Sequence, residues 1–366
     1  MHLPSLPRII AIAGKELRQL LRDRLTVGMV IGVPTLQILL FGFAINTDVR
    51  HLEAGLVDAA HTQLSTMFVS RLTATQVIDI VTVGTTPGDL VDAMRRGDIS
   101  VGVVIPHDFE QRLRRRNTPA AQILVDASDP IILAAARQLA QTPIRVRGDG
   151  GVVSETIAVD ARYNPERRSA VNIVPGLIGV ILTLTMVLFT AMAIVRERER
   201  GNLEFLITTP VRPWELMLAK ILPYIGIGLI QVTLVLLLGA TIFNVPIRGG
   251  LLDVYAAALL FVAASLALGL VISTLAKTQF QAMQLTIFVF LPSIFLSGFM
   301  FPFAGMPRLA QQIGEFLPLT HFVRLSRGIV LRGATLGELS VEAWSLVVFA
   351  GLALAVAALR FRKRLD

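Results

Sequence analysis

Six long stretches of this chain contain no Asp, Glu, Lys or Arg, and the charged residues lie between them. The stretches are Leu25–Ile45, Asn172–Val195, Ile221–Phe243, Val254–Ala276, Met283–Phe303 and Ala343–Leu359. A transmembrane helix needs about 20 predominantly apolar residues to cross the hydrocarbon core of a bilayer, and each stretch approaches or exceeds that length. The pattern therefore predicts an all-α membrane domain with six spans.

The composition agrees with a membrane protein. Hydrophobic residues make up 54% of the chain and charged residues 16%, whereas a typical soluble domain has about 25% charged residues. Because carriers that are coupled to protons or ions usually need ionisable groups inside the membrane, the charge-free spans argue against a secondary transporter. The chain has no cysteine, which excludes disulfides and thiolate metal sites within it.

The basic residues predict how the spans are oriented. Fifteen of them lie in segments that six spans would place on one side of the membrane, and five lie in the short segments on the other side. By the positive-inside rule, both termini and the loop 196–220 are cytoplasmic, and residues 46–171 are extracytoplasmic. This long segment holds 14 basic and 15 acidic residues, so the net charge of +8 belongs to the cytoplasmic face and indicates no nucleic-acid groove. The five outer basic residues are Arg248, Arg308, Arg324, Arg327 and Arg332.

The first 45 residues are predicted to form a cytoplasmic amphipathic helix and then a span. Residues 1–24 place apolar side chains on one helix face and basic ones opposite, which suits the membrane interface. An ordinary charged flank of an anchor is the other interpretation. Residues 25–45 have an apolar core longer than the usual 7–15 residues of a signal peptide, which favours an uncleaved anchor over a cleaved signal.

Residues 46–171 alternate strand and helix patterns. Short apolar strands are predicted at Glu53–Asp58, Val77–Val83, Ile99–Ile105 and Ala121–Ala127. Thr86-Pro87 starts a helix that Gly97 stops, and Asp129-Pro130 opens another that runs through about Gln141. Strands that alternate with helices predict an inserted extracytoplasmic α/β domain.

Two groups of polar residues in this domain are interpreted as surface features. The basic cluster of residues 112–116 is a solvated helix end rather than a binding patch. His51, His61 and His107 have no regular metal-ligand spacing.

The cytoplasmic loop 196–220 is the most informative polar segment. Alternating charge over residues 196–200 continues the second span, and Gly201-Asn202 then breaks that helix, with Asn202 placed to cap a new one. The new helix, residues 203–207, is apolar although it lies outside the membrane. Such a helix bracketed by charge indicates a docking surface for a soluble partner. A helix that lies on the lipid face is the alternative interpretation.

Residues 304–335, beyond the fifth span, mix apolar side chains with four of the outer arginines. Short helices that dip into the outer leaflet would explain this mixture. Within the preceding span, Pro292 is expected to kink the helix and Pro302 to end or bend it.

No catalytic, cofactor-binding or metal-ligating pattern stands out. The nucleotide-binding pattern G-x-x-x-x-G-K-[ST] is missing, because Gly14-Lys15 is followed by Glu16 and Ile9 stands where the first Gly should be. Neither H-E-x-x-H nor G-x-S-x-G occurs. The chain is therefore predicted not to be an enzyme.

Several stretches, taken in order, carry a family resemblance. They are Tyr163-Asn164-Pro165, Val174-Pro175-Gly176, Val195 to Glu204, Thr209-Pro210-Val211, Phe301-Pro302, Gly305-Met306-Pro307 and Leu317 to Thr320. With these stretches the chain resembles the permease subunits of ABC-2-type exporters, which have six spans each. It is most similar to the multidrug-efflux-like branch with a large extracytoplasmic domain after the first span. The likeness covers essentially the whole chain, and Asn202 stands where a Thr is expected.

The resemblance implies partners and a mechanism. A second permease subunit, identical or related, would enclose the export path in the lipid bilayer, with spans two to six supplied by residues 172–366. A cytosolic ABC ATPase dimer would bind ATP and Mg and dock beneath, and this chain would hold no cofactor. The ATPase-coupling residues would be Arg196, Glu197, Arg198, Glu199, Gly201, Asn202, Leu203, Glu204, Phe205 and Leu206.

By the same resemblance, ATP binding would switch the spans between inward- and outward-open states. Residues 304–335 would form re-entrant outer helices that cap the path. The expected location is a bacterial inner membrane. There a periplasmic adaptor and an outer-membrane channel would be further partners, in contact with residues 46–171.

The predicted function is the export of amphipathic drugs or lipid-like compounds. Apolar cavities between helices suit such compounds, and the candidate path residues are Asn172, Gln231, Gln284 and Pro292. Polar residues in spans more often satisfy a neighbouring helix. The alternative is a membrane-anchored assembly or sensor protein whose extracytoplasmic domain binds a partner, although six spans are more than an anchor needs.

Overall fold

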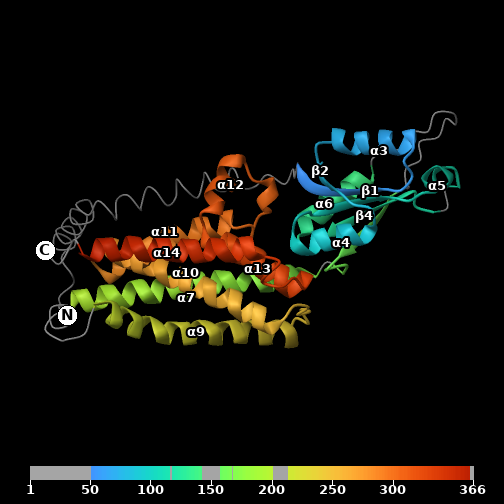
Figure 1. Ribbon diagram of the computed structural model, residues 1–366. Helices are drawn as coiled ribbons and strands as arrows, with labels where there is room; N and C mark the ends of the chain where they lie inside the picture. Colours follow the sequence, from blue (N-terminus) through green and yellow to red (C-terminus); the bar gives the residue numbers. More distant parts are fainter. Residues whose placement is uncertain (1–50, 116–117, 142–156, 167, 201–212, 363–366) are drawn as a thin grey trace, which may run out of the picture.

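The chain forms a bundle of long helices with an α/β domain at one end, as seen in a computed structural model (Figure 1). The structure describes residues 51–115, 118–141, 157–166, 168–200 and 213–362. The predicted interfacial helix 1–24 and the predicted first span 25–45 lie outside these residues.

The α/β domain is built on one five-stranded sheet with the strand order β2-β1-β3-β4-β5. Its strands are β1 (Leu52–Asp58), β2 (Ile78–Val83), β3 (Val101–Ile105), β4 (Ala121–Asp126) and β5 (Ile157–Arg162). Its helices are α3 (Gln63–Ala74), α4 (Pro87–Arg96), α5 (Phe109–Arg115) and α6 (Pro130–Ala140). β1, β2 and β3 are parallel, β4 runs antiparallel to β3, and β5 runs parallel to β4.

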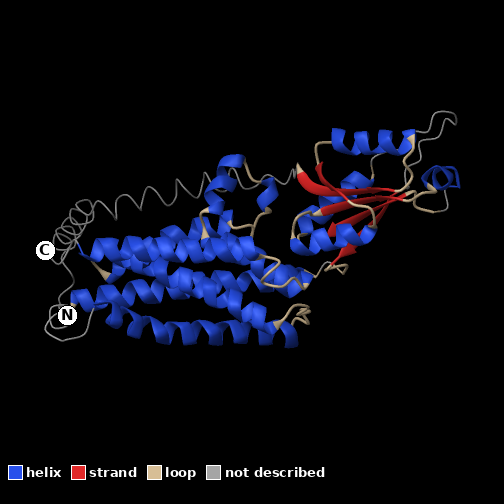
Figure 2. Ribbon diagram, viewed as in Figure 1, coloured by secondary structure: helices blue, strands red, loops and turns tan. Residues whose placement is uncertain are grey.

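The sheet lies between two layers of helices (Figure 2). Side chains on one face, such as Val103 and Ile123, pack with Phe68 of α3 and Leu139 of α6. The next residue along β4, Leu124, faces the other way and packs with α4. This alternation follows from the two-residue period of a strand, and it buries both faces of the sheet.

The four expected strands are confirmed, with ends that differ by no more than two residues. The fifth strand, β5, and the helix α3 were not predicted. β5 is an edge strand that is only partly buried, and Asp160 and Arg162 interrupt its apolar residues. α3 contains two Ser and two Thr among its 12 residues, and a capping box between Thr62 and Ser65 supports its start.

The predicted helix boundaries in this domain are confirmed where capping chemistry defines them. The Thr86 side chain accepts a hydrogen bond from the Asp89 backbone, and Gly97 ends α4 with φ of 88°. This left-handed conformation suits glycine because it has no Cβ. Asp129 caps α6 through the backbone N–H of Ile131, at 2.9 Å.

The bundle contains five helices, among the described residues, that are long and apolar enough to cross a membrane. They are α7 (Ser169–Glu199), α9 (Pro213–Thr241), α10 (Leu251–Leu275), α11 (Gln279–Leu296) and α14 (Ser340–Arg362). They correspond to the second to sixth predicted spans. Short elements between α11 and α14 are η1 (Phe303–Gly305), α12 (Arg308–Glu315), α13 (Pro318–Arg327) and the π-helical η2 (Gly328–Arg332).

The helices alternate in direction, which defines two ends of the bundle (Figure 1). We call the end where α7 begins and α11 finishes the domain end, because it lies next to the α/β domain. The far end is where α7 finishes and α11 begins.

The fifth predicted span, Met283–Phe303, differs from the helix that forms. α11 covers Gln279–Leu296 and continues through Pro292. It ends because Gly298 adopts φ of 79°, a left-handed conformation that helix ends commonly use. The prediction that Pro302 ends or bends this span is wrong, because α11 already ends at Leu296 and Pro302 precedes the 3-10 turn η1.

α10 is the central helix of the bundle. It contacts α7, α9, α11, α13 and α14, and Phe261 on α10 stacks on Phe322 of α13 with ring centres 4.3 Å apart. Gly269 lies so close to α7 that an added Cβ would come within 2.8 Å of the Val187 carbonyl oxygen. Small residues allow such close approach between membrane helices.

Candidate functional sites at the two ends of the bundle

At the far end, the charged last turn of α7 is bonded to the connection between α10 and α11. Arg198 donates from Nη1 to the backbone oxygens of Ser273 and Ala276, at 3.1 and 3.0 Å. These carbonyls belong to the end of α10, where backbone oxygens lack helical partners and the helix dipole favours a cation. Arg198 thus joins the ends of two predicted spans.

Glu199 makes the matching connection to α11. Its carboxylate accepts hydrogen bonds from the Gln279 backbone N–H at 2.9 Å and from the Gln279 side-chain amide at 2.5 Å. Gln279 is the first residue of α11. A displacement of the end of α7 would therefore act directly on both α10 and α11.

The other residues of the predicted coupling segment fall into two groups. Arg196 and Arg200 are exposed, and Glu197 is half buried. Gly201, Asn202, Leu203, Glu204, Phe205 and Leu206 lie outside the described residues. The charge run, which the sequence presented as one surface, thus divides into exposed arginines and side chains that hold the neighbouring helices.

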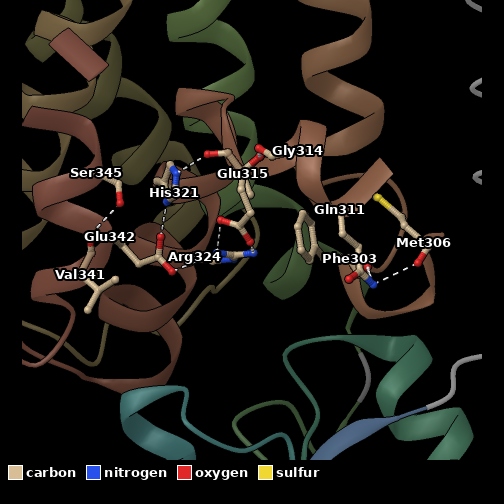
Figure 3. A network of polar contacts seen from close by, with 11 residues as sticks. Phe303, Met306, Gln311, Gly314, Glu315, His321, Arg324, Val341, Glu342 and Ser345 are labelled. Carbon is tan, nitrogen blue, oxygen red and sulfur yellow. Dashed lines mark hydrogen bonds and ion pairs between the residues drawn. The ribbon is translucent and has the colours of Figure 1, made fainter. Parts of the chain in front are cut away.

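The domain end contains a network of charged side chains from three helices (Figure 3). Arg324 on α13 donates to Glu315 at the end of α12, with Nη2 2.5 Å from Oε1, and to Glu342 in the first turn of α14, with Nη1 3.1 Å from Oε1. His321, one turn before Arg324, bonds the other carboxylate oxygen of Glu342 through Nδ1. The ring of Phe303 lies 4.5 Å from the Arg324 guanidinium carbon.

The partners of His321 indicate its protonation state. Nδ1 faces the Glu342 carboxylate and Nε2 lies 2.9 Å from the backbone oxygen of Glu315. Both partners are acceptors, so both ring nitrogens must donate, which only the imidazolium can do. Burial lowers the pKa of His321, but the bonds to Glu342 and to the Glu315 carbonyl outweigh it, so the pKa is raised above its ordinary 6.5.

The network is balanced in charge when His321 is protonated, because two carboxylates then face two cations. The side chains of His321 and Glu342 are 10% and 17% exposed, and removing one member of such a pair leaves a poorly solvated charge. The arrangement can hold α12, α13 and α14 together. Among the described residues, no group of three or more His, Cys, Asp or Glu side chains is placed to bind a metal ion.

No pattern in the sequence indicates this network directly. In the sequence Arg324 stands out only as one of the five outer basic residues, and neither His321 nor Glu342 belongs to a recognisable motif. The one indication is that basic residues accumulate in the segments predicted to lie on the outer side of the membrane, where the positive-inside rule disfavours them. This accumulation indicates that they bind acidic or other hydrogen-bond-accepting groups.

Comparison with known proteins identifies the family. A family model described as ABC-2 family transporter protein matches residues 24–359. The chain is also 32% identical over 370 residues to the probable multidrug ABC transporter permease YbhS of Escherichia coli (strain K12), which covers 98% of each protein. The chain belongs to the ABC-2 transporter family.

Two further relatives from Escherichia coli (strain K12) are similar over nearly their whole length. The probable multidrug ABC transporter permease YbhR is 26% identical, over 98% of this chain and 99% of that protein. The inner membrane transport permease YhhJ is 27% identical, over 98% of each. The family resemblance seen in the sequence is confirmed, and the five apolar helices fit a multi-pass membrane permease of an ABC transporter.

In this ABC-2 protein, the four candidate path residues lie on three helices, α7, α9 and α11. Asn172, in the first turn of α7, is buried beside Asn164. The side-chain nitrogen of Asn164 lies 3.4 Å from Oδ1 of Asn172. Gln231, midway along α9, accepts a hydrogen bond from the Thr185 hydroxyl of α7 at 3.0 Å. Both residues therefore satisfy neighbouring polar groups.

The other two candidates are both on α11. Gln284 lies near the far end, and its buried Oε1 has no hydrogen-bond partner among the described residues. Pro292 lies in the second half of the helix. The structure does not bring the four residues together, so their role in a substrate path stays a prediction.

Proposed function

We propose that this chain is the permease subunit of an ATP-driven exporter that moves amphipathic drugs or lipid-like compounds out of the cytoplasm or the inner leaflet. The observation that carries the proposal is an ABC-2 bundle of apolar helices, similar over 98% of its length to proteins named multidrug ABC transporter permease. ATP and Mg would bind in a separate cytosolic ATPase, and a second permease subunit would complete the path.

The far end would be the cytoplasmic end, where the ATPase docks. The bonds of Arg198 to α10 and of Glu199 to α11 support this role. A displacement of residues 201–210 would be transmitted to α10 and α11 through the side chains of Arg198 and Glu199. Two such subunits, driven together by ATP binding, would change the packing of the spans and alternate access to the path.

The domain end would be extracytoplasmic, with residues 304–335 capping the path. On α12 and at its C-cap, Leu309, Ile313 and Phe316 are exposed on one face, at 71%, 47% and 79%. Their spacing matches a single helix stripe, which suits insertion into the outer leaflet. The network of His321, Arg324, Glu315 and Glu342 would hold this cap closed in the resting state.

Other partners would follow from this orientation. The α/β domain would face the periplasm of a bacterium with two membranes, where an adaptor and an outer-membrane channel would continue the path. The apolar interior between the spans favours amphipathic or lipid-like cargo, since such sites are lined mainly by hydrophobic side chains.

The proposal is tested by purifying the chain from native membranes in mild detergent and identifying what co-purifies by mass spectrometry. We expect a stoichiometric ATP-binding protein. Leu206→Asp, which puts a charge into the predicted docking helix, should release it.

A matched control is Val83→Asp, which places the same charge at a side chain of β2 that is 75% exposed. This variant should keep the ATPase. If no ATPase co-purifies with the wild-type chain and both variants retain the same partners, the coupling proposal fails and the membrane-anchored sensor becomes the better interpretation.

A further inference from the structure

The α/β domain meets the bundle through arginine side chains at the domain end. Arg332, in the π-helical η2, forms an ion pair with Asp126 at the end of β4, with Nη1 3.6 Å from Oδ2. The two side chains are only 12% and 8% exposed. π-helical turns often occur at functional sites, and this one contributes the charge that crosses between the two parts of the molecule.

The Arg332 guanidinium lies between two glycines, one from each part. A Cβ added to Gly97, the C-cap of α4, would lie 3.0 Å from Nη1, and one added to Gly328 would lie 3.0 Å from Nη2. The carbonyl end of α4 also attracts a cation through the helix dipole. The position of Arg332 therefore depends on the absence of a side chain on both sides.

A second ion pair joins the same two parts. Arg95, in the last turn of α4, donates from Nη2 to Glu338 Oε1 at 2.8 Å. Glu338 precedes α14, and its carboxylate also accepts bonds from the Thr335 backbone N–H and hydroxyl, at 2.8 and 3.1 Å. The bonds from Thr335 thus fix the position of the Glu338 carboxylate that Arg95 binds.

Two more arginines attach the surrounding segments to this junction. Arg248, between α9 and α10, donates from its backbone N–H to the Val330 carbonyl and from Nη1 to the Leu331 carbonyl, at 2.9 and 3.2 Å. Its guanidinium carbon lies 5.6 Å from the ring centre of Tyr163, the residue after β5.

Arg327, at the end of α13, donates to the Gly298 and Phe299 carbonyls after α11, at 3.0 and 3.4 Å. Its charge also opposes the rise in the pKa of Asp129 that burial causes. Arg327 thus binds the segment after α11, and its charge acts on an acidic side chain of the α/β domain.

We infer that the α/β domain is fastened to α13, η2 and the start of α14 by this arginine clamp, which comprises Arg95, Arg248, Arg327 and Arg332 with their partners. The domain therefore moves as one body with the domain-end helices. Side-chain contacts therefore hold the domain on the bundle, in addition to its chain connections to the first two predicted spans.

The clamp has a consequence that rests on the proposed function. If α13 and η2 shift when the transporter opens, the α/β domain shifts with them. By linkage, a partner that prefers one position of the domain would bias the state of the bundle. Arg332 acts in this as a positioning residue, through η2.

A spin-label distance measurement on the full chain in lipid nanodiscs tests the clamp. The chain has no native cysteine, so labels can be placed at Ala74→Cys on α3 and Ser340→Cys at the start of α14, both exposed. We expect a single narrow distance. Arg332→Ala and, from the other side of the pair, the near-isosteric Asp126→Asn should each replace it with a broad distribution.

Arg96→Ala is the matched control, because Arg96 lies beside Arg95 but pairs with Asp98 of the same domain. It should leave the narrow distance unchanged. The clamp is refuted if Arg332→Ala and Asp126→Asn both keep the narrow distance, or if the parent chain already shows a broad one.

The movement is tested separately on the complex with its ATPase, trapped with ATP and vanadate. The distance between residues 74 and 340 should stay the same in the trapped state, and a changed or split distance would overturn the movement as one body. If no ATPase associates with the chain, the proposed function fails, while the nanodisc result still decides the clamp.

Discussion

At the scale of single residues, the contacts of His321 define its chemical state most clearly, because they require the protonated imidazolium. Both of its ring nitrogens face acceptors, and the two carboxylates around Arg324 need a second cation for balance. The charged groups that face His321 are Glu342 on α14 and Arg324 on its own helix, while α12 contributes a carbonyl and the Glu315 carboxylate.

This state predicts a loss of stability as the pH rises above about 6.5. The folded pKa of His321 is raised above its ordinary 6.5, so the imidazolium contributes its full stabilisation below about pH 6.5, and the contribution is lost as the pH rises through the folded pKa. The melting temperature of the detergent-solubilised chain is measured as the pH is raised from below about 6.5 through the folded pKa of His321. It should fall more for the wild type than for His321→Gln.

His107→Gln is the control, since His107 is exposed on the α/β domain. Its melting temperatures should follow those of the wild type at every pH. Equal pH dependence in the wild type and His321→Gln would show that the proton on His321 does not stabilise the fold.

The residues that sequence reasoning placed well are those with local partners. Thr86 and Gly97 define the ends of α4 through neighbours within three or four positions, so the pattern is visible in the sequence. His321 and Glu342 are 21 positions apart in the sequence, and Arg332 and Asp126 are 206 positions apart. Such partners are determined by packing, which a single sequence does not reveal.

At the scale of elements, the length of each stretch without charged residues was sufficient to find the second to sixth spans. A helix that crosses the bilayer needs about 20 predominantly apolar residues, so the requirement is visible in the sequence. This criterion failed at the end of α11, where the apolar run continues to Phe303 but the helix stops before Gly298. It also did not resolve residues 304–335, where η1, α12, α13 and η2 are too short and too mixed for a clear period.

The packing of α10 on α7 gives a prediction about one small residue. A side chain at Gly269 would collide with Thr190 and with the Val187 carbonyl, both within 2.8 Å of the added Cβ. Gly269→Val should therefore destabilise the bundle by about 1–3 kcal/mol, the usual cost of overpacking. The readout is a lower melting temperature of the purified chain.

Gly351→Val makes the same change on α14, where an added Cβ meets nothing within 4 Å. It should melt close to the wild type. If Gly269→Val is as stable as Gly351→Val, α7 and α10 do not pack as closely as the structure has them.

At the scale of the whole molecule, the two ends of the bundle carry different chemistry. The far end joins α7, α10 and α11 through Arg198 and Glu199, and the domain end joins α12, α13 and α14 through the His321 network. An exporter needs to connect events at two such ends, and the helices between them are long and apolar. The orientation of these ends across the membrane is part of the proposal.

The central claim is that ATP hydrolysis by a separate protein drives cargo through this chain. The most direct measurement uses liposomes that contain the chain and its co-purified ATPase, with a fluorescent amphipathic dye as cargo. Dye should move only with ATP and Mg, from the side of the far end to the side of the domain end. Leu206→Asp should abolish this movement and Val83→Asp should not. Dye movement that follows a proton gradient without ATP, or that is unchanged by Leu206→Asp, would contradict the claim.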